Sequence, residues 1–295
     1  MNRLMNTIQW IVRQPLNKGM KQKTLKRFLL WQINTRINPY PIILPWVNQA
    51  KLIVKKGMAG ATGNLYAGLH EFEDMSFLLH FLRKEDLFTD IGSNIGSYTI
   101  LASGAVGASS IAIEPIPVTF NYLKNNIAVN NMQDRVEPLN IGMGNSHSVL
   151  KFTSTHDSMN HVAVEGDTNV IEVPVRTLDE ILQNKPCPSL IKIDVEGFET
   201  EVLSGGKHTL ENPDLKAVII ELNGSGLRYG YKDEDIHATF MSMGFRPYVY
   251  EPFTRHLMEL KTYSEENNTI YIRDVNFVEN RLKNADPFRV MNMEI

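Results

Sequence analysis

The chain has 295 residues, of which 43% are hydrophobic and 21% charged, as expected for a folded protein with one large domain or one domain and an appendage. Its single cysteine, Cys187, excludes an intrachain disulfide, and no stretch reaches the roughly 18–20 apolar residues of a membrane span. We therefore expect a cytoplasmic protein.

The charge is distributed unevenly along the chain, although the net charge is only −3. Residues 1–70 contain eleven lysines and arginines and no aspartate or glutamate. The remaining 19 basic and 33 acidic residues give the rest of the chain a charge of −14. A basic segment of this kind indicates an anionic partner.

Residues 20–33 have the spacing of a basic amphipathic helix. Three prolines between residues 39 and 45 then interrupt regular structure. We expect a strand over 51–54, a second short strand over 65–67 and a helix over 71–83.

From residue 87 short apolar strands alternate with helical segments. The expected strands are 87–91, 110–113, 135–139, 190–194 and 217–222. The expected helices are 96–103, 117–130, 177–182, 198–203 and 233–243. Segments 149–152 and 170–175 resemble an inserted hairpin, and late strands over 247–250 and 269–272 suggest an antiparallel edge. This pattern predicts an α/β fold with a mostly parallel, Rossmann-like sheet of seven strands and helices on both faces.

The first of these strands ends in a glycine loop, Asp90-Ile91-Gly92-Ser93-Asn94-Ile95-Gly96. Glycines let the backbone turn sharply and approach a ligand, and ligands of such sheets bind at the carboxyl ends of the strands. Asp90 would repel a pyrophosphate but favours the ammonium and sulfonium of S-adenosylmethionine. Only Gly92 and Gly96 are present, so the spacing also differs from the dinucleotide pattern G-x-G-x-x-G.

An acid at the end of the next strand strengthens this interpretation. Glu114 follows Asp90 by 24 residues, where a carboxylate can accept hydrogen bonds from both hydroxyls of a ribose. Either acid alone is compatible with a solvated strand end, but the two together predict a site for S-adenosylmethionine. A dehydrogenase that binds a nicotinamide dinucleotide is correspondingly disfavoured.

Four segments resemble the signatures of the FkbM family of S-adenosylmethionine-dependent methyltransferases, in order, over roughly residues 71–222. They are 88–99, 113–117, 175–180 and 191–199, the last reading Ile-Lys-Ile-Asp-Val-Glu-Gly-Phe-Glu. A small departure is Ser93, where the family usually has alanine. The resemblance implies a class I methyltransferase fold and O-methyl transfer, often to sugars of polysaccharides, glycolipids or natural products.

The cofactor-binding residues that we predict come from the glycine loop and the ends of the following strands. They are Asp90, Gly92, Ser93, Asn94, Gly96, Tyr98, Glu114 and Asn140.

Lys192, Asp194 and Glu196 alternate along the expected strand over 190–194 and just beyond it, so we expect them on one face. Three charges there are costly unless they pair or bind something, and we predict that they are catalytic. The alternative is a structural ion pair between Lys192 and Asp194. The proton of an acceptor hydroxyl needs a general base or a metal ion.

Two candidates for that task stay open. Asp194, Glu221 and Asn223 at adjacent strand ends would offer oxygen ligands to Mg²⁺. Among the histidines near the inserted hairpin (147, 156 and 161), His161 is the preferred base, although exposure in a loop is the commoner role for each.

We predict three parts of the chain: a basic extension or lid over residues 1–70, a methyltransferase domain over 71–275 and a tail over 276–295. The acceptor is expected to be a saccharide or glycolipid, or else another small molecule such as a polyketide, lipid or amine. A cofactor-binding module without activity is the non-enzymatic alternative.

For the basic extension, one interpretation is peripheral contact of residues 1–60 with an anionic membrane, at its inner face. No recognition motif supports nucleic-acid binding. The third interpretation, slightly favoured, is a packed helical lid over the cofactor, with a homodimer as an option.

Overall fold

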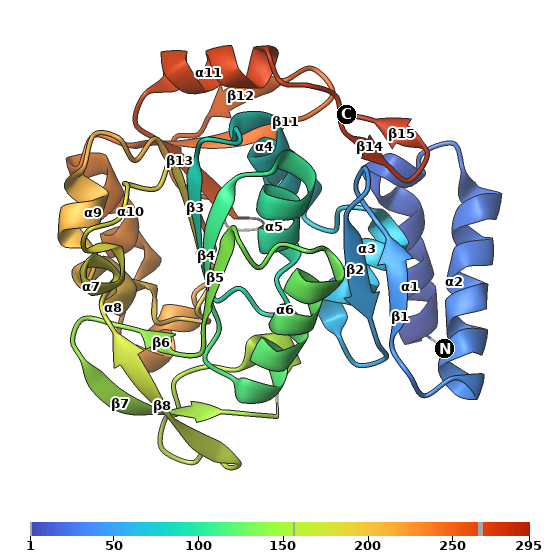
Figure 1. The fold of residues 1–295 in the computed structure, drawn as a ribbon, viewed down its shortest axis with the longest axis horizontal. Helices are drawn as coiled ribbons and strands as arrows, with labels where there is room; N and C mark the ends of the chain where they lie inside the picture. The colour runs from blue at the N-terminus through green and yellow to red at the C-terminus, as the bar shows by residue number, and fades with distance from the viewer. Residues whose placement is uncertain (1, 156, 265–267) are drawn as a thin grey trace.

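The computed structural model describes residues 2–155, 157–264 and 268–295 (Figure 1). The helical segments, short turns of helix included, are α1 (Asn2–Arg13), η1 (Pro15–Asn17), α2 (Lys21–Ile37), α3 (Ala59–Ala67), α4 (Phe72–Phe81), α5 (Ser97–Thr99), η2 (Ile100–Val106), α6 (Pro117–Val129), η3 (Asp157–Met159), α7 (Leu178–Leu182), α8 (Glu199–Ser204), α9 (Lys207–Glu211), η4 (Ser225–Tyr229), α10 (Asp233–Ser242) and α11 (Val275–Lys283).

The strands are β1 (Ile42–Pro45), β2 (Lys51–Val54), β3 (Leu87–Ile91), β4 (Ser109–Ile113), β5 (Val136–Leu139), β6 (Gly142–Met143), β7 (Ser148–Thr153), β8 (Val170–Arg176), β9 (Leu190–Ile193), β10 (Ala217–Ile220), β11 (Arg246–Glu251), β12 (His256–Glu259), β13 (Thr269–Ile272), β14 (Arg289–Val290) and β15 (Met293–Glu294).

The central sheet has the strand order β12-β11-β13-β10-β9-β3-β4-β5. Strands β10, β9, β3, β4 and β5 are parallel neighbours, which confirms the predicted α/β fold with a mostly parallel sheet. Every residue of β9 and β10 is buried, as expected for strands covered on both faces. Helices α4, α5 and α6 lie on one face, and α7 to α10 on the other (Figure 1).

The far edge of the sheet differs from the prediction of seven strands. Strand β13 lies inside, between β10 and β11, and pairs antiparallel with both. An eighth strand, β12, forms the edge beside β11. Only Leu257 of β12 is buried, so this segment lacks the hydrophobic alternation from which a strand can be predicted.

The basic extension folds against the same core as the sheet. Helices α1 and α2 stand beside the hairpin β1–β2, which packs against α6 (Figure 1). The expected helix over 20–33 is longer, and the strand expected over 65–67 was wrong because these residues end helix α3. Residues 42–45 form strand β1 although Pro41 precedes the strand and Pro45 ends it. Strand β1 pairs on one side only, so a proline at its end costs little.

The C-terminal segment also joins this core. Asp274 caps α11 by accepting a hydrogen bond from the backbone N–H of Phe277. Beyond α11, Val290 and Ile295 are buried in the main hydrophobic cluster, together with Ile11 and Phe28 of the extension. The three predicted parts of the chain therefore share one continuous core.

The predicted inserted hairpin is confirmed as β7 and β8, which pair antiparallel. The two-residue strand β6 adds to β8 and completes a small separate sheet. In the described part of the chain, no helix combines the length and the apolar character needed to cross a bilayer.

Gly92 is where the sheet tolerates least change. Its φ is +77°, and a Cβ atom there would lie 1.7 Å from the carbonyl oxygen of Asp194. We expect Gly92→Ala to lower the free energy of unfolding by several kcal/mol, about 4 or more, because the clash is with backbone. Gly244→Ala is the matched control, since Gly244 also has a positive φ (+85°) but open space around it. A cost of about 1 kcal/mol is expected there. Equal losses for both variants in chemical denaturation would contradict the close approach.

Candidate functional site

A cavity of about 660 Å³ opens at the carboxyl ends of β3, β4, β9 and β10. This is the edge at which parallel α/β sheets bind ligands, and the volume is in the range of small-molecule pockets. The strand ends form its floor, the inserted hairpin contributes Phe152 and Val162, and α1 and α3 of the extension contribute a third wall.

The loop after β3 lines the floor of this cavity. Asp90, near the end of β3, is buried, and its carboxylate accepts hydrogen bonds from the backbone N–H (3.1 Å) and the hydroxyl (2.6 Å) of Thr99. Burial raises the pKa of Asp90 to about 6, although Lys192 and Thr99 act in the opposite direction. Gly92, Ser93 and Asn94 line the cavity beside it.

Glu114 connects this loop to the end of β4. One carboxylate oxygen accepts a hydrogen bond from the backbone N–H of Asn94 (3.0 Å), and the other accepts one from Ile116 (2.9 Å). Burial raises the pKa of Glu114 to about 8, against the effect of these two hydrogen bonds. Each oxygen keeps a second lone pair that a ligand hydroxyl in the cavity can use.

Two other predicted cofactor residues have different environments. Ser93 is buried, and its hydroxyl has no hydrogen-bond partner among the described residues, so a ligand in the cavity can provide one. Asn140 does not line the cavity. Its side-chain amide instead donates to the carbonyls of Glu114 and Pro115, so it supports the turn that carries the acid.

Lys192 is a buried cation surrounded by acids. Its Cα is directly opposite that of Asp90 in the β3–β9 register, and its Nζ lies 2.6 Å from Oδ2 of Asp194. Its ammonium also lies 4.8 Å from the ring centre of Tyr98, at the cavity wall. Burial alone would lower the pKa of Lys192, but Asp194, Glu71 and Asp90 raise it above its ordinary value. Lys192 therefore stays charged.

The prediction that Lys192, Asp194 and Glu196 alternate along one strand was wrong. Strand β9 ends at Ile193, and Asp194 and Glu196 lie in the turn that follows. Glu196 has a φ of +56° and Gly197 a φ of +104°, so a left-handed turn, and not the pleat of a strand, orients Glu196. A left-handed glutamate is uncommon and is typical of a site where the surroundings hold the backbone.

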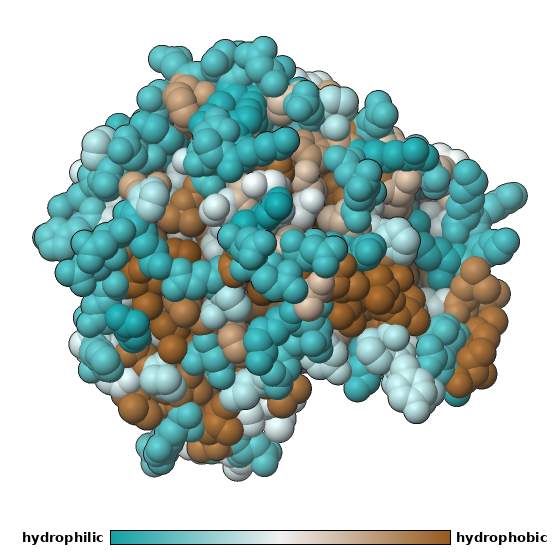
Figure 2. Space-filling view, viewed as in Figure 1, coloured by the Kyte–Doolittle hydropathy of each residue, from teal (hydrophilic) through white to brown (hydrophobic). Residues whose placement is uncertain are grey.

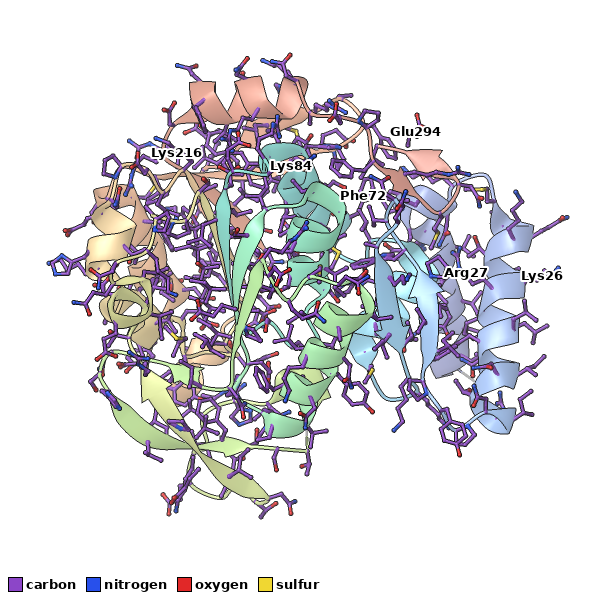
Figure 3. The ribbon with its side chains drawn as sticks, in the orientation of Figure 1. Lys26, Arg27, Phe72, Lys84, Lys216 and Glu294 are labelled. Carbon is purple, nitrogen blue, oxygen red and sulfur yellow. The ribbon has the colours of Figure 1, made fainter. Side chains whose placement is uncertain are left out.

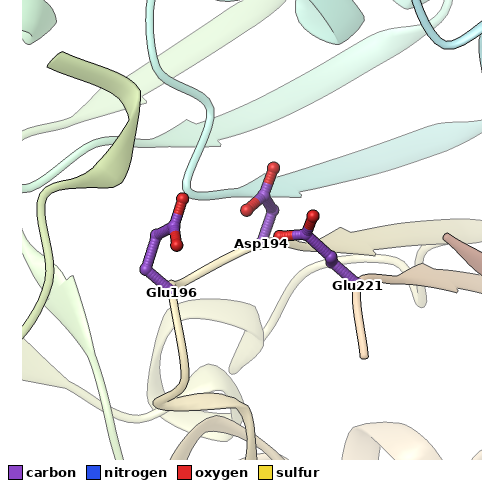
Figure 4. Close-up of side chains that lie close together, drawn as sticks. All are labelled: Asp194, Glu196 and Glu221. Atoms are coloured by element: carbon purple, nitrogen blue, oxygen red, sulfur yellow. The ribbon is translucent and has the colours of Figure 1, made fainter. Parts of the chain in front are cut away.

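This turn brings three carboxylates together at the edge of the cavity (Figure 4). Asp194, Glu196 and Glu221 each offer an oxygen within 4.8 Å of the others, and all three are partly buried. Burial and then the charge of Asp194 raise the pKa of Glu196 to about 8 and that of Glu221 to about 7. The cluster therefore suits a proton acceptor or an oxygen-liganded cation.

His161 lies outside this cluster, whereas Asn223 lies at its outer side, where a side-chain hydrogen bond to Glu221 acts to lower the pKa of that acid. Asn223 is exposed, does not line the cavity, and its Oδ1 accepts a hydrogen bond from the backbone N–H of Ser225. Among the acidic side chains, the third oxygen donor of the cluster is Glu196, for which the sequence predicts a catalytic role.

His161 contacts its own hairpin, and its expected role as a base stays a prediction. Its Nδ1 lies 3.0 Å from the carbonyl oxygen of Met159, its Nε2 lies 3.2 Å from Asp167, and it does not line the cavity. Of the other two, His147 is exposed near Glu180, and His156 lies outside the described residues.

Several residues that line the cavity were missed from the sequence. Glu71 follows the extension directly, and Thr7 and Trp10 reach the cavity from α1. For Glu71, burial would raise the pKa, but His70, Lys192 and the side chains of Tyr98 and Asn268 lower it below its ordinary value. Its one sequence signal is that it is the first acid after seventy residues without any. Trp10 carried no signal, because its contact with the cavity depends on tertiary packing.

The cavity fits S-adenosylmethionine in its chemistry. Asp90, Glu71 and the carboxylate cluster outnumber the single ammonium of Lys192, which favours a ligand with an ammonium and a sulfonium. Glu114 has free lone pairs for ribose hydroxyls, and Ser93 has an unused hydroxyl. A pyrophosphate would meet these acids without a compensating cluster of donors.

Comparisons with known proteins agree with this chemistry. The profile of the methyltransferase FkbM domain matches residues 90–247. The hexuronic acid methyltransferase AglP of Haloferax volcanii is 30% identical over 158 residues, which are 52% of this chain and 62% of that protein. Methyltransferase 1 of Beauveria bassiana is 28% identical over 146 residues, 41% of this chain and 58% of that protein. The chain thus spans about three fifths of the length of these relatives.

Similarity to solved structures is looser. The structure of TrmK from M. capricolum with S-adenosyl-homocysteine aligns over 68% of each chain, at 10% identity and a TM-score of 0.38. A similarity of this degree carries no argument about function. The family match covers more than half of the chain and includes the glycine loop, Glu114 and the carboxylate cluster. By this match, the chain belongs to the FkbM family of S-adenosylmethionine-dependent methyltransferases.

Proposed function

We propose that this protein transfers the methyl group of S-adenosylmethionine to a hydroxyl group of a saccharide or glycolipid. The observation that carries the proposal is the acidic cavity, in which the glycine loop and Glu114 lie beside the carboxylates of Asp194, Glu196 and Glu221. A site for a cationic donor thus adjoins groups that accept a proton.

Residues of the loop after β3 and the end of β4 would hold the cofactor. Glu114 would accept hydrogen bonds from the ribose hydroxyls, and Ser93 and Asn94 would contact polar groups of the ligand. Asp90 and Glu71 lie where negative charge stabilises the ammonium and sulfonium. When bound, S-adenosylmethionine would supply an electrophilic methyl carbon for the acceptor oxygen, with a neutral thioether as the leaving group.

The carboxylate cluster would receive the proton that the acceptor hydroxyl loses. Asp194 and Glu196 are the candidate bases; both line the cavity, as does Glu221. Lys192, at 2.6 Å from Asp194, holds that carboxylate in place. Lys192 is therefore a positioning residue, and the ion pair serves the reaction as well as the fold.

The class of acceptor is supported by the relative that acts on a hexuronic acid, which is 30% identical over the matched part. The carboxylates and amides that line the cavity would also suit a polar, hydroxylated acceptor. A polyketide, lipid or amine acceptor is the alternative. An inactive cofactor-binding module is less consistent with a buried lysine and three clustered acids, because these are costly to keep without a use.

Mg²⁺ at the same cluster is the second candidate for activating the hydroxyl. Asp194, Glu196 and Glu221 would supply its oxygen ligands, and a divalent cation would lower the pKa of a bound hydroxyl. The ammonium of Lys192 already occupies one side of Asp194 and would repel a second cation. We therefore favour direct proton transfer to a carboxylate.

A saccharide carried on a lipid would bring the enzyme to a membrane. We accordingly propose that residues 1–60 make peripheral contact with an anionic membrane surface. A homodimer through the same segment is the competing arrangement.

Cofactor binding can be measured by calorimetry. We expect wild-type protein to bind S-adenosylmethionine and not a nicotinamide dinucleotide. Glu114→Gln should weaken S-adenosylmethionine binding by about tenfold to a hundredfold, because one accepting carboxyl oxygen becomes an NH2 donor. Glu137→Gln, an exposed acid on the neighbouring strand β5, is the control and should bind like wild type. Preference for the dinucleotide, or no binding of either ligand, would refute the assigned cofactor.

The proposed base is tested by Asp194→Asn. This change removes the proton acceptor while keeping the shape of the side chain. We expect transfer of a labelled methyl group to a hexuronic acid glycoside to fall by at least about a hundredfold. S-adenosylmethionine affinity should fall far less than turnover, since general-base loss affects chemistry more than binding. The exposed Asp214→Asn provides the control. Unchanged turnover in the Asp194 variant would rule out this assignment.

Chelation separates the two modes of hydroxyl activation. If a carboxylate takes the proton directly, excess EDTA should leave turnover unchanged, and added Mg²⁺ should not raise it. A loss of activity in chelator that Mg²⁺ restores would instead establish the metal mode at this cluster.

A further inference from the structure

Helix α2 is apolar on two roughly opposite sides. Thr24, Phe28 and Trp31 face inward and are buried in the core. A second apolar stripe follows the helix at intervals of four residues and is exposed, with Ile37 77% accessible. This outer stripe comprises Leu25, Leu29, Leu30, Ile33 and Ile37.

The outer stripe is part of a larger surface. Figure 2 shows hydrophobic side chains gathered over α2 at the right-hand edge of the molecule. Tyr40 and Ile43 are exposed beyond the end of the helix. A shallow groove of about 360 Å³ between α2 and β1 adds Ile42 and Leu44.

Basic side chains accompany this apolar surface. Lys21, Lys23, Lys26 and Arg36 on α2 are exposed, and the sequence has no acid before Glu71. Figure 3 shows Lys26 pointing away from the molecule, whereas Arg27 points inward. There Arg27 donates to Asn17 and to the carbonyl of Tyr66, so it serves the fold. The exposed side chains of Lys21, Lys23 and Lys26 are available to a ligand.

We infer that the outer face of α2 docks onto an anionic phospholipid bilayer, with the outer stripe inserted among the lipids and the lysines on the headgroups. An exposed apolar stripe bordered by cations is the pattern of helices that lie in a membrane interface. Lysine stems can lie along apolar surface while the ammonium reaches a phosphate. This proposal assigns the membrane contact of the proposed function to one face of α2, with anionic phospholipid as its partner.

Charge argues against the other occupants. A symmetric dimer through α2 would set the lysines of one copy against those of the other. A nucleic acid would pair with the lysines, but it would leave the apolar stripe facing phosphates and water. A bilayer offers acyl chains to the apolar stripe and phosphates to the lysines.

Docking through α2 would also place the cavity near the membrane. Helix α1 packs against α2, and its Thr7 and Trp10 line the cavity. A saccharide on a lipid anchor could then enter from the side of the extension. This consequence rests on the proposed function, whereas the docking itself does not.

The experiment is co-sedimentation of the full chain with vesicles. We compare phosphatidylcholine alone with phosphatidylcholine containing phosphatidylglycerol, at low and high salt. Wild type should bind the anionic vesicles only, and less at high salt. Leu29→Ser combined with Ile33→Ser should weaken binding by at least about tenfold. Lys21→Gln combined with Lys26→Gln should weaken it by about thirtyfold, from two charges at the surface.

Matched controls lie elsewhere on the surface. Val118→Ser with Val149→Ser removes two equally exposed apolar side chains, and Lys232→Gln with Lys261→Gln removes two exposed cations. Both should bind like wild type. Circular dichroism and thermal unfolding verify that each variant is folded, and the charge variant tests the surface without altering its packing.

Three results would overturn the inference: no binding of wild type to anionic vesicles, equal binding by the α2 variants, or wild type that binds a duplex oligonucleotide in preference to vesicles. A dimer in size-exclusion chromatography that Leu29→Ser with Ile33→Ser dissolves, without vesicle binding, would assign the face to self-association. Methyl transfer to a water-soluble glycoside without vesicles should be unaffected by these variants. Failure of that transfer in wild type would count against the proposed function alone.

Discussion

The site depends on the close approach of two backbones at the ends of neighbouring parallel strands. The loop after β3 passes so near the turn after β9 that a Cβ at Gly92 would lie 1.7 Å from the carbonyl of Asp194. This approach sets Asp90 beside Lys192 and brings the glycine loop to the carboxylate cluster. Donor and acceptor sites are thereby held on rigid strand ends, which is what alignment of two reactants needs.

Charge balance is the second constraint. A buried lysine stands among several acids, and the acids are in excess. Burial raises the pKa of Glu114, Glu196 and Glu221, so the cavity carries more carboxyl groups than it can comfortably ionise. A cationic ligand would stabilise the ionised carboxylates. The excess of acidic groups in the cavity therefore favours the proposed cofactor, which is positively charged at its ammonium and sulfonium.

The basic extension has two faces with different uses. Its inner elements, α1 and α3, form a wall of the cavity, which accords with a packed lid. Its outer helix α2 keeps an apolar stripe that the core does not cover. The two interpretations of residues 1–70, lid and membrane contact, are thus compatible, because they concern opposite sides of the same segment.

The sequence by itself determined the features that local pattern encodes. Short apolar runs between helical segments predicted the parallel strands, and the motif from Asp90 to Gly96 with Glu114 predicted the cofactor loop. Tertiary structure decided what depends on contacts between distant segments. The left-handed turn oriented Glu196, packing brought Glu71 and Trp10 to the cavity, and its own hairpin engaged His161. Periodicity records which face of an element is buried, but it does not record which other element lies against that face.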